Sequence, residues 1–265
     1  MEDKLQHPTV VEVGDGAAIP LKSDVGLFTA WRLAFFGAIG TVACLAITRP
    51  DPYLRILKFV PDGILVTFKV TVGAILLALI LGLFTGLGRL AKNKLINGIA
   101  SLYVEVIRGI PLLVQIFYIY YALGRIVHIP DLYSAVIAMA ICYGAYMGEI
   151  FRAGIQSIPR GQMEAARSLG MTHSQAMRHI IIPQAFKVVL PPIGNEFIAL
   201  LKDSSLVSIL AVSDLLRRGR EFASESFSYF ETYTIIALIY LVLTLFFSKL
   251  IGFMEERIGV DKQPS

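Results

Sequence analysis

Six long apolar runs constrain the fold of this chain more than any other feature of its sequence. They cover residues 27–48, 64–88, 99–123, 132–155, 188–212 and 232–253. A helix needs about 20 apolar residues to cross a bilayer, and each run reaches that length. The composition agrees, because 55% of the residues are hydrophobic and only 17% are charged, against about 25% charged in soluble domains. The sequence therefore predicts an all-α, polytopic membrane protein and argues against a soluble enzyme.

The N-terminal part of the chain divides into two segments. Residues 1–26 are polar, and we interpret them as a poorly ordered tail. Residues 27–61 hold the first transmembrane helix and a connector, in which apolar side chains alternate with Arg55 and Lys58. That alternation favours a short amphipathic segment lying on the membrane surface.

The basic residues indicate which loops face the cytoplasm. The net charge is +4, and in a membrane protein such an excess reflects cytoplasmic loops rather than binding to nucleic acid. Arg89, Lys92 and Lys94 follow one run with no acidic residue between them. Residues 160–187 carry further basic side chains at helical spacing. We expect both segments on the cytoplasmic side, the second as one or two amphipathic helices outside the bilayer.

Glycine spacing predicts where two spans approach each other. Gly82 and Gly86 lie in one run, and Gly144 and Gly148 lie in another, each pair separated by three residues. Such small-xxx-small spacing lets helix backbones come close together. The alternative is chance spacing in a glycine-rich chain.

The segment 160–187 contains a motif with fixed spacing. Its members are Glu164-Ala165-Ala166, then Gly170 after three residues, then Ile180-x-Ile182-Pro183 after nine more. Glycine can end one helix and start another at an angle, and proline marks a bend or a new first turn. The motif resembles the EAA loop of bacterial ABC importer permeases, in which EAA, G and I-x-L-P have this spacing between two membrane spans. Ile182 in place of Leu is the one departure.

Several flanking stretches narrow the resemblance. They are 105–115, 149–155, 159–162, 183–185, 190–192, 195–196 and 202–206. They are similar to stretches of the permeases for polar amino acids, the histidine, glutamine, glutamate and arginine group. The resemblance covers residues 62–253 and implies a five-span type I ABC importer permease core with its EAA loop at about 160–187. It makes 27–48 an extra N-terminal transmembrane helix and 254–265 a cytoplasmic tail.

The resemblance implies a function and a set of partners. The chain would be the permease subunit of an ATP-driven importer for polar amino acids in the bacterial cytoplasmic (inner) membrane. A second permease subunit, identical or related, would complete the pathway, and an extracytoplasmic substrate-binding protein would deliver the amino acid. Contact with a cytoplasmic ABC ATPase dimer would be carried by Glu164, Ala165, Ala166 and Gly170. The ATPase would bind ATP and Mg, since this chain has no P-loop sequence, and we expect no catalytic residue, cofactor or metal site in it.

A cytoplasmic EAA loop sets the direction of every span. The basic loop after residues 64–88 then also lies inside, in agreement with the charge rule. Arg217, Arg218 and Arg220 instead fall outside, against that rule. We expect these arginines at the outer surface near an acidic partner.

Two charged pairs lie within the spans near the inner mouth. Glu105 and Arg108 are three residues apart, as are Glu149 and Arg152, so each pair can form an ion pair on one helix. Charges within spans face the protein interior or water and mark function. We interpret both pairs as a gate or structural clamp, in preference to direct contact with substrate.

A further charged group lies near mid-membrane. Lys202 and Asp203 stand beside two serines, after a helix that we expect to start near a proline pair. Irregular backbone at that depth is tolerated where it lines a cavity or packs within protein. A zwitterionic amino acid could be complemented by Lys202 and Asp203, although these residues could instead pair with each other or with Glu196. The predicted pathway residues are Lys202, Asp203, Ser204, Ser205, Asn195 and Glu196.

Two other functions are compatible with the apolar runs. An ion- or proton-coupled secondary amino acid transporter would use Glu105, Glu149 and Asp203 as ion sites. A structural or sensory membrane protein would transport nothing. The EAA spacing argues against both.

Overall fold

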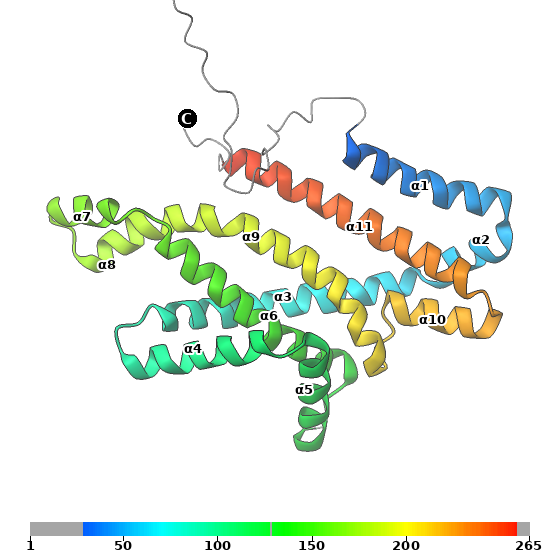
Figure 1. The fold of residues 1–265 in the computed structure, drawn as a ribbon, viewed down its shortest axis with the longest axis horizontal. Coiled ribbons are helices and arrows are strands. Elements are labelled where there is room, and N and C mark those ends of the chain that lie inside the picture. Colours follow the sequence, from blue (N-terminus) through cyan, green and yellow to red (C-terminus); the bar gives the residue numbers. More distant parts are fainter. Residues whose placement is uncertain (1–28, 128, 259–265) are drawn as a thin grey trace, which may run out of the picture.

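The computed structural model describes residues 29–127 and 129–258, and within them it is helical (Figure 1). The predicted tail 1–26 and residues 259–265 lie outside these ranges. The helices are α1 (Ala30–Thr48), α2 (Pro50–Phe59), α3 (Pro61–Arg89), α4 (Lys94–Gly109), α5 (Leu112–Ile126), α6 (Asp131–Gln156), α7 (Arg160–Ser168), α8 (His173–Ala176), α9 (Ile182–Asp203), α10 (Leu215–Ser226) and α11 (Tyr229–Ile258). The all-α prediction is confirmed.

Four helices in the described ranges are long and apolar enough to cross a membrane, namely α1, α3, α6 and α11. The run 99–123 is not one uninterrupted helix, because α4 and α5 meet at an angle of 112°. Pro111 has no N–H to donate, and its ring disfavours helical geometry in the preceding residue. The Gln115 side chain bridges the break by donating to the carbonyls of Ile107 (2.5 Å) and Ile110 (2.6 Å).

The run 188–212 is also interrupted. The helix α9 begins before it, at Ile182, so that Pro191 and Pro192 lie inside the helix rather than near its start. The helix ends at Asp203, where a 3-10 helix, Ser204–Leu210, follows. Irregular backbone therefore begins directly after Asp203.

The helices α3 and α6 pack backbone against backbone at their glycines. A Cβ atom placed on Gly82 would lie 2.2 Å from the Met147 Cβ, and one on Gly86 would lie 2.8 Å from the Gly148 carbonyl oxygen. Gly144 faces Leu81 in the same way. The two predicted glycine pairs thus face each other, which confirms the close approach of these spans.

The N-terminal helices pack on the C-terminal ones. Figure 1 shows α1 alongside α11, and the Trp31 indole N–H donates to the Leu245 carbonyl at 2.9 Å. The apolar face of α2, with Tyr53 and Ile56, is buried in a cluster that includes Leu215 of α10 and residues of α11. The segment is a short helix whose apolar face packs on α10 and α11, and its position at the membrane surface stays a prediction.

The two predicted cytoplasmic segments lie at the same end of the bundle. In Figure 1, α7, α8 and the turn between α3 and α4 are on the left, whereas α2 and α10 are on the right. The α11 helix continues to Ile258, so the first part of the predicted tail 254–265 extends a transmembrane helix.

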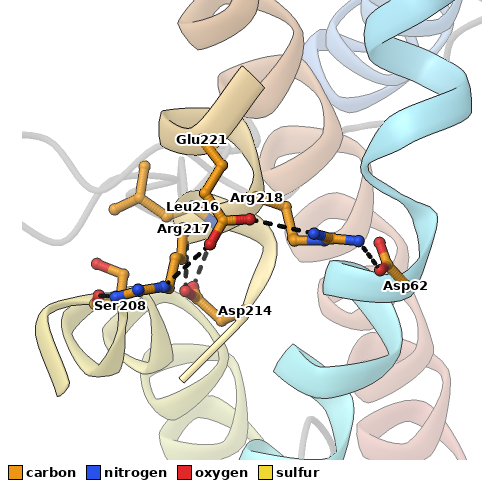
Figure 2. Close-up of polar contacts among 7 residues, drawn as sticks. All are labelled: Asp62, Ser208, Asp214, Leu216, Arg217, Arg218 and Glu221. Carbon is orange, nitrogen blue, oxygen red and sulfur yellow. Dashed lines mark hydrogen bonds and ion pairs between the residues drawn. The ribbon is translucent and has the colours of Figure 1, made fainter. Parts of the chain in front are cut away.

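The helix α10 lies at the opposite end, and two of its arginines, Arg217 and Arg218, find acidic partners within this chain (Figure 2). Arg218 pairs with Asp62 of α3 and with Glu221, whose other oxygen is 3.1 Å from Arg217. Arg217 also donates to the Ser208 carbonyl at 3.3 Å, which ties α10 to the 3-10 helix. Asp214 caps α10 by accepting two backbone N–H bonds, and burial raises the pKa of this carboxyl to about 6. For Arg217 and Arg218, acidic partners are therefore supplied by α3 and α10, whereas Arg220 is exposed and has no ion pair with a described residue.

Candidate functional site

The EAA motif forms a compact loop of two helices. The helix α7 ends at Ser168, and Gly170 adopts a left-handed backbone with φ of +83°. The N–H of Gly170 donates to the Arg167 carbonyl, which satisfies a group left open at the helix end. Thr172 and Gln175 then form a reciprocal capping box that starts α8. Gly170 thus ends one helix before another begins at an angle, as predicted.

One face of this loop is free of contacts with the rest of the described chain. Glu164 and Ala165 are exposed, and Leu169 is 83% exposed. Ala166 is different, because it is 4% exposed and its carbonyl accepts the Met171 N–H at 3.2 Å. Exposed apolar and acidic side chains at one end of the molecule are suited to contact another protein, and Ala166 supports the loop from within.

Four charged residues from three helices meet near the inner end of the bundle. This inner charge cluster consists of Arg89 of α3, Arg108 of α4, and Glu149 and Arg152 of α6. The Glu149 carboxylate is hydrogen-bonded to Arg89 and Arg152, and it lies 3.6 Å from Arg108. The predicted ion pair between Glu149 and Arg152 is confirmed.

The predicted pairing of Glu105 with Arg108 is wrong. Glu105 is exposed and forms no ion pair with any residue in 29–127 or 129–258. Arg108 turns toward α6 instead, since α6 offers both a carboxylate and an aromatic ring: its guanidinium lies 5.5 Å from the centroid of the Tyr146 ring. The sequence analysis did not predict that Arg89 pairs with Glu149. The available signal was the position of Arg89, directly after the apolar run 64–88 and at the same end as Glu149.

The predicted pathway residues differ in the contacts that they make. Asp203 accepts a hydrogen bond from the Tyr143 hydroxyl at 2.7 Å, whereas Lys202 is exposed and makes no ion pair with a described residue. The two are adjacent on a helix and therefore project about 100° apart. The alternative in which Lys202 pairs with Asp203 or Glu196 is wrong.

The remaining pathway candidates differ in exposure. Ser204 is buried and its hydroxyl donates to the Leu201 carbonyl at 2.8 Å, so it completes the end of α9. Ser205 is half-buried, and Asn195 is exposed. Glu196 is half-buried, and the charges that act on it are those of Asp203 and Arg108. Tyr143, which sequence reasoning missed, had no signal beyond being a tyrosine in an apolar run.

Comparison with known proteins assigns the chain to a family. The family model described as "binding-protein-dependent transport system inner membrane component" matches residues 74–260. The L-cystine transport system permease protein TcyB of Bacillus subtilis (strain 168) is 39% identical over 198 residues, which are 74% of this chain and 85% of that protein. The arginine transport system permease protein ArtQ of Bacillus subtilis (strain 168) is 36% identical over 203 residues, covering 76% of this chain and 92% of ArtQ.

A solved structure extends the comparison to the fold. The structure described as an amino acid ABC transporter with histidines is 47% identical, with a TM-score of 0.74. The matched region is 77% of this chain and 96% of the chain in that structure. The helices α1 and α2 precede the residues that the family model matches. The chain therefore belongs to the family of binding-protein-dependent transport system inner membrane components, which are non-enzymatic, membrane-spanning permease subunits of ABC transporters.

Proposed function

We propose that this chain is the permease subunit of an ATP-driven importer for polar amino acids in the bacterial cytoplasmic membrane. The observation that carries the proposal is the exposed EAA loop, which lies at the same end of the bundle as the basic turn after α3. A loop with exposed Glu164 and Ala165 beside basic segments fits a cytoplasmic dock for an ATPase. The relatives named above are cystine and arginine permeases by name, which supports an amino acid substrate. Membership of the binding-protein-dependent family supports an ATP-driven mechanism over an ion-coupled one.

The proposal includes partners for each end of the molecule. A cytoplasmic ABC ATPase dimer would bind ATP and Mg and contact Glu164, Ala165 and the Gly170 turn. An extracytoplasmic binding protein would deliver the amino acid at the end formed by α2 and α10. The permease domain would comprise residues 62–253, with α1 and part of the connector to α3 as an N-terminal addition.

The end of α9 would line the pathway, and Lys202 supports this. An ammonium group within a span is costly unless it faces water or protein, yet Lys202 is exposed and has no ion-pair partner in the part of the chain that the structure describes. Asn195 is seven residues earlier, on the same face of α9, and is also exposed. This polar face would meet a second permease subunit across a water-filled pathway. The inner charge cluster would hold α3, α4 and α6 together at the cytoplasmic end of this pathway.

Reversing the charge at the dock tests the coupling role. In Glu164→Lys, we expect the chain to insert in the membrane but to lose the ATPase partner, because an exposed cation replaces the carboxylate at the contact. Co-purification of the ATPase with the tagged permease, together with ATP-dependent uptake, measures the effect. Glu256→Lys, an exposed reversal at the end of α11, is the matched control and should retain the partner. Normal co-purification and uptake by Glu164→Lys would refute the coupling role.

Replacing Asp203 tests whether this residue belongs to the transport pathway. Asp203→Asn removes the charge that would hydrogen-bond the ammonium group of the substrate, an interaction worth about 1.5–3 kcal/mol, so we expect uptake at low substrate concentration to fall about tenfold or more. Uptake by proteoliposomes that contain the whole complex measures the change, and Glu256→Gln is the matched control. Thermal unfolding should show that the variant remains folded. Unchanged uptake would exclude Asp203 from the pathway.

A further inference from the structure

Glu105 and Arg108 are opposite charges on the same face of α4 that do not satisfy each other. Glu105 is exposed and without an ion pair among the residues described, and the Arg108 side chain donates no hydrogen bond to any of them. The 3.6 Å between Arg108 and Glu149 is longer than a hydrogen bond. Glu149 is already hydrogen-bonded to Arg89 and Arg152. Arg108 thus has an ion pair with Glu149 but donates no hydrogen bond to a described residue, which leaves donors available for another acceptor.

Arg108 is nevertheless held in one orientation. Its guanidinium lies over the Tyr146 ring, 5.5 Å from the centroid, within the range of a cation–π contact. Its side chain is 45% exposed, which leaves it open on the side away from α6. An oriented guanidinium with free donors can form a bidentate pair with a carboxylate without first losing much conformational freedom.

Both charges line one cavity. It has a volume of about 290 Å³ and is lined by Val104, Glu105, Arg108, Gly109 and Tyr146. This volume is at the lower end of the range for small-molecule sites, about 300–1,000 Å³. The inner charge cluster has three arginines and one glutamate, so the part of the cavity near Arg108 favours a negatively charged group. The Glu105 carboxylate favours a positively charged group in the same cavity.

The cavity lies on the inner side of Asp203. The Tyr146 ring is 5.9 Å from the Tyr143 ring, and the Tyr143 hydroxyl is bonded to Asp203. Two aromatic rings on successive turns of α6 thus separate the cavity from the predicted pathway residues. Under the proposed topology, the cavity is therefore nearer the cytoplasmic end of α6 than the contact between Tyr143 and Asp203.

We propose that this cavity binds the zwitterionic head of the transported amino acid, with Arg108 holding the α-carboxylate and Glu105 holding the α-ammonium. The proposal rests on the proposed function, because it takes the substrate to be an amino acid. It adds a recognition site, common to all amino acids, on the cytoplasmic side of Asp203.

Blocked substrates provide the test. The permease is purified with its ATPase and without any binding protein, and the twenty amino acids are screened for a thermal shift of the complex. The amino acid with the largest shift is then titrated beside its methyl ester, which lacks the carboxylate, and its N-acetyl form, which lacks the ammonium. The wild type should bind the free amino acid about tenfold or more tightly than either derivative. Arg108→Gln should lose the preference for the free amino acid over the methyl ester but keep the preference over the N-acetyl form. Glu105→Gln should show the opposite pattern.

The controls separate recognition from stability. A purely structural role for these residues would weaken all three ligands equally, and that result would overturn the proposal. Arg108→Lys, which keeps the charge, should restore part of the preference over the ester. Equal discrimination by the wild type and both variants would also refute the site. If the wild-type complex binds no amino acid at all, the proposed function fails with it, whereas binding with unaltered discrimination counts against the site alone.

Discussion

Replacing Gly82 with leucine is expected to prevent α3 and α6 from packing and to leave little folded protein. The Cβ of any residue at this position would lie 2.2 Å from the Met147 Cβ and 2.9 Å from the Gly148 nitrogen. The second of these atoms is backbone and cannot rotate away, so the two helices would have to separate. Overpacking a well-packed interior costs about 3 kcal/mol at the upper end of its usual range, and separation would also lose contacts around Gly86 and Gly144.

The matched control is Gly98→Leu. Gly98 lies in α4, and a Cβ atom at this position would have nothing within 4 Å of it, so the same change meets open space there. The free energy of unfolding of the two variants in detergent, from thermal or SDS titration, gives the comparison. Equal stability of Gly82→Leu and Gly98→Leu would show that the close approach of α3 and α6 is not essential.

Replacing Glu149 with glutamine is expected to destabilise the inner charge cluster. The Glu149 carboxylate forms ion pairs with Arg89, Arg108 and Arg152, and its side chain is 20% exposed. Glutamine has a similar shape but no charge, so three guanidinium groups from three helices would repel one another without a counter-charge. Removing one partner from a buried ionic group costs roughly 3–5 kcal/mol, and partial exposure places the expected loss near the lower value, about 3 kcal/mol.

A double variant shows whether charge is the cause. Glu149→Gln combined with Arg152→Gln removes one of the repelling charges, and part of the lost stability should return. Glu105→Gln, which removes an exposed carboxylate without an ion-pair partner among the described residues, should change the free energy of unfolding by no more than about 0.5 kcal/mol. A Glu149→Gln protein as stable as Glu105→Gln would show that the cluster does not hold the helices together.

Features that depend on residues close together in the sequence were predicted correctly. The spans around α3, α6 and α11 follow from runs of apolar side chains, which need no partner to be recognised. The facing glycines of α3 and α6 follow from a spacing of four residues, because that spacing returns to the same side of a helix. Gly170 ends α7 because a residue without Cβ tolerates a positive φ, and this too is a local property.

Predictions that required the choice between two possible partners were less successful. Spacing on α4 allowed Arg108 to pair with Glu105, but α6 presents a carboxylate and a tyrosine ring to Arg108 across the helix interface. Likewise Asp203 is bonded to Tyr143, which is 60 residues earlier in the chain, and not to its neighbour Lys202. In each case the charged side chain has more than one possible polar partner, and the distances between the packed helices determine which contact forms.

The linear pattern of this chain was sufficient to predict α1, α3, α6 and α11 as long apolar helices, the family motif, and the family to which the chain belongs. Hydrophobic length, charge bias and glycine spacing are each read along one helix or one loop, so no folded partner is needed. The burial of α2 and the partners of Arg108, Asp203 and Arg218 depended on the packed bundle. Those features arise because helices distant in sequence compete to satisfy the same polar and apolar groups, and only their arrangement in space determines which contact forms.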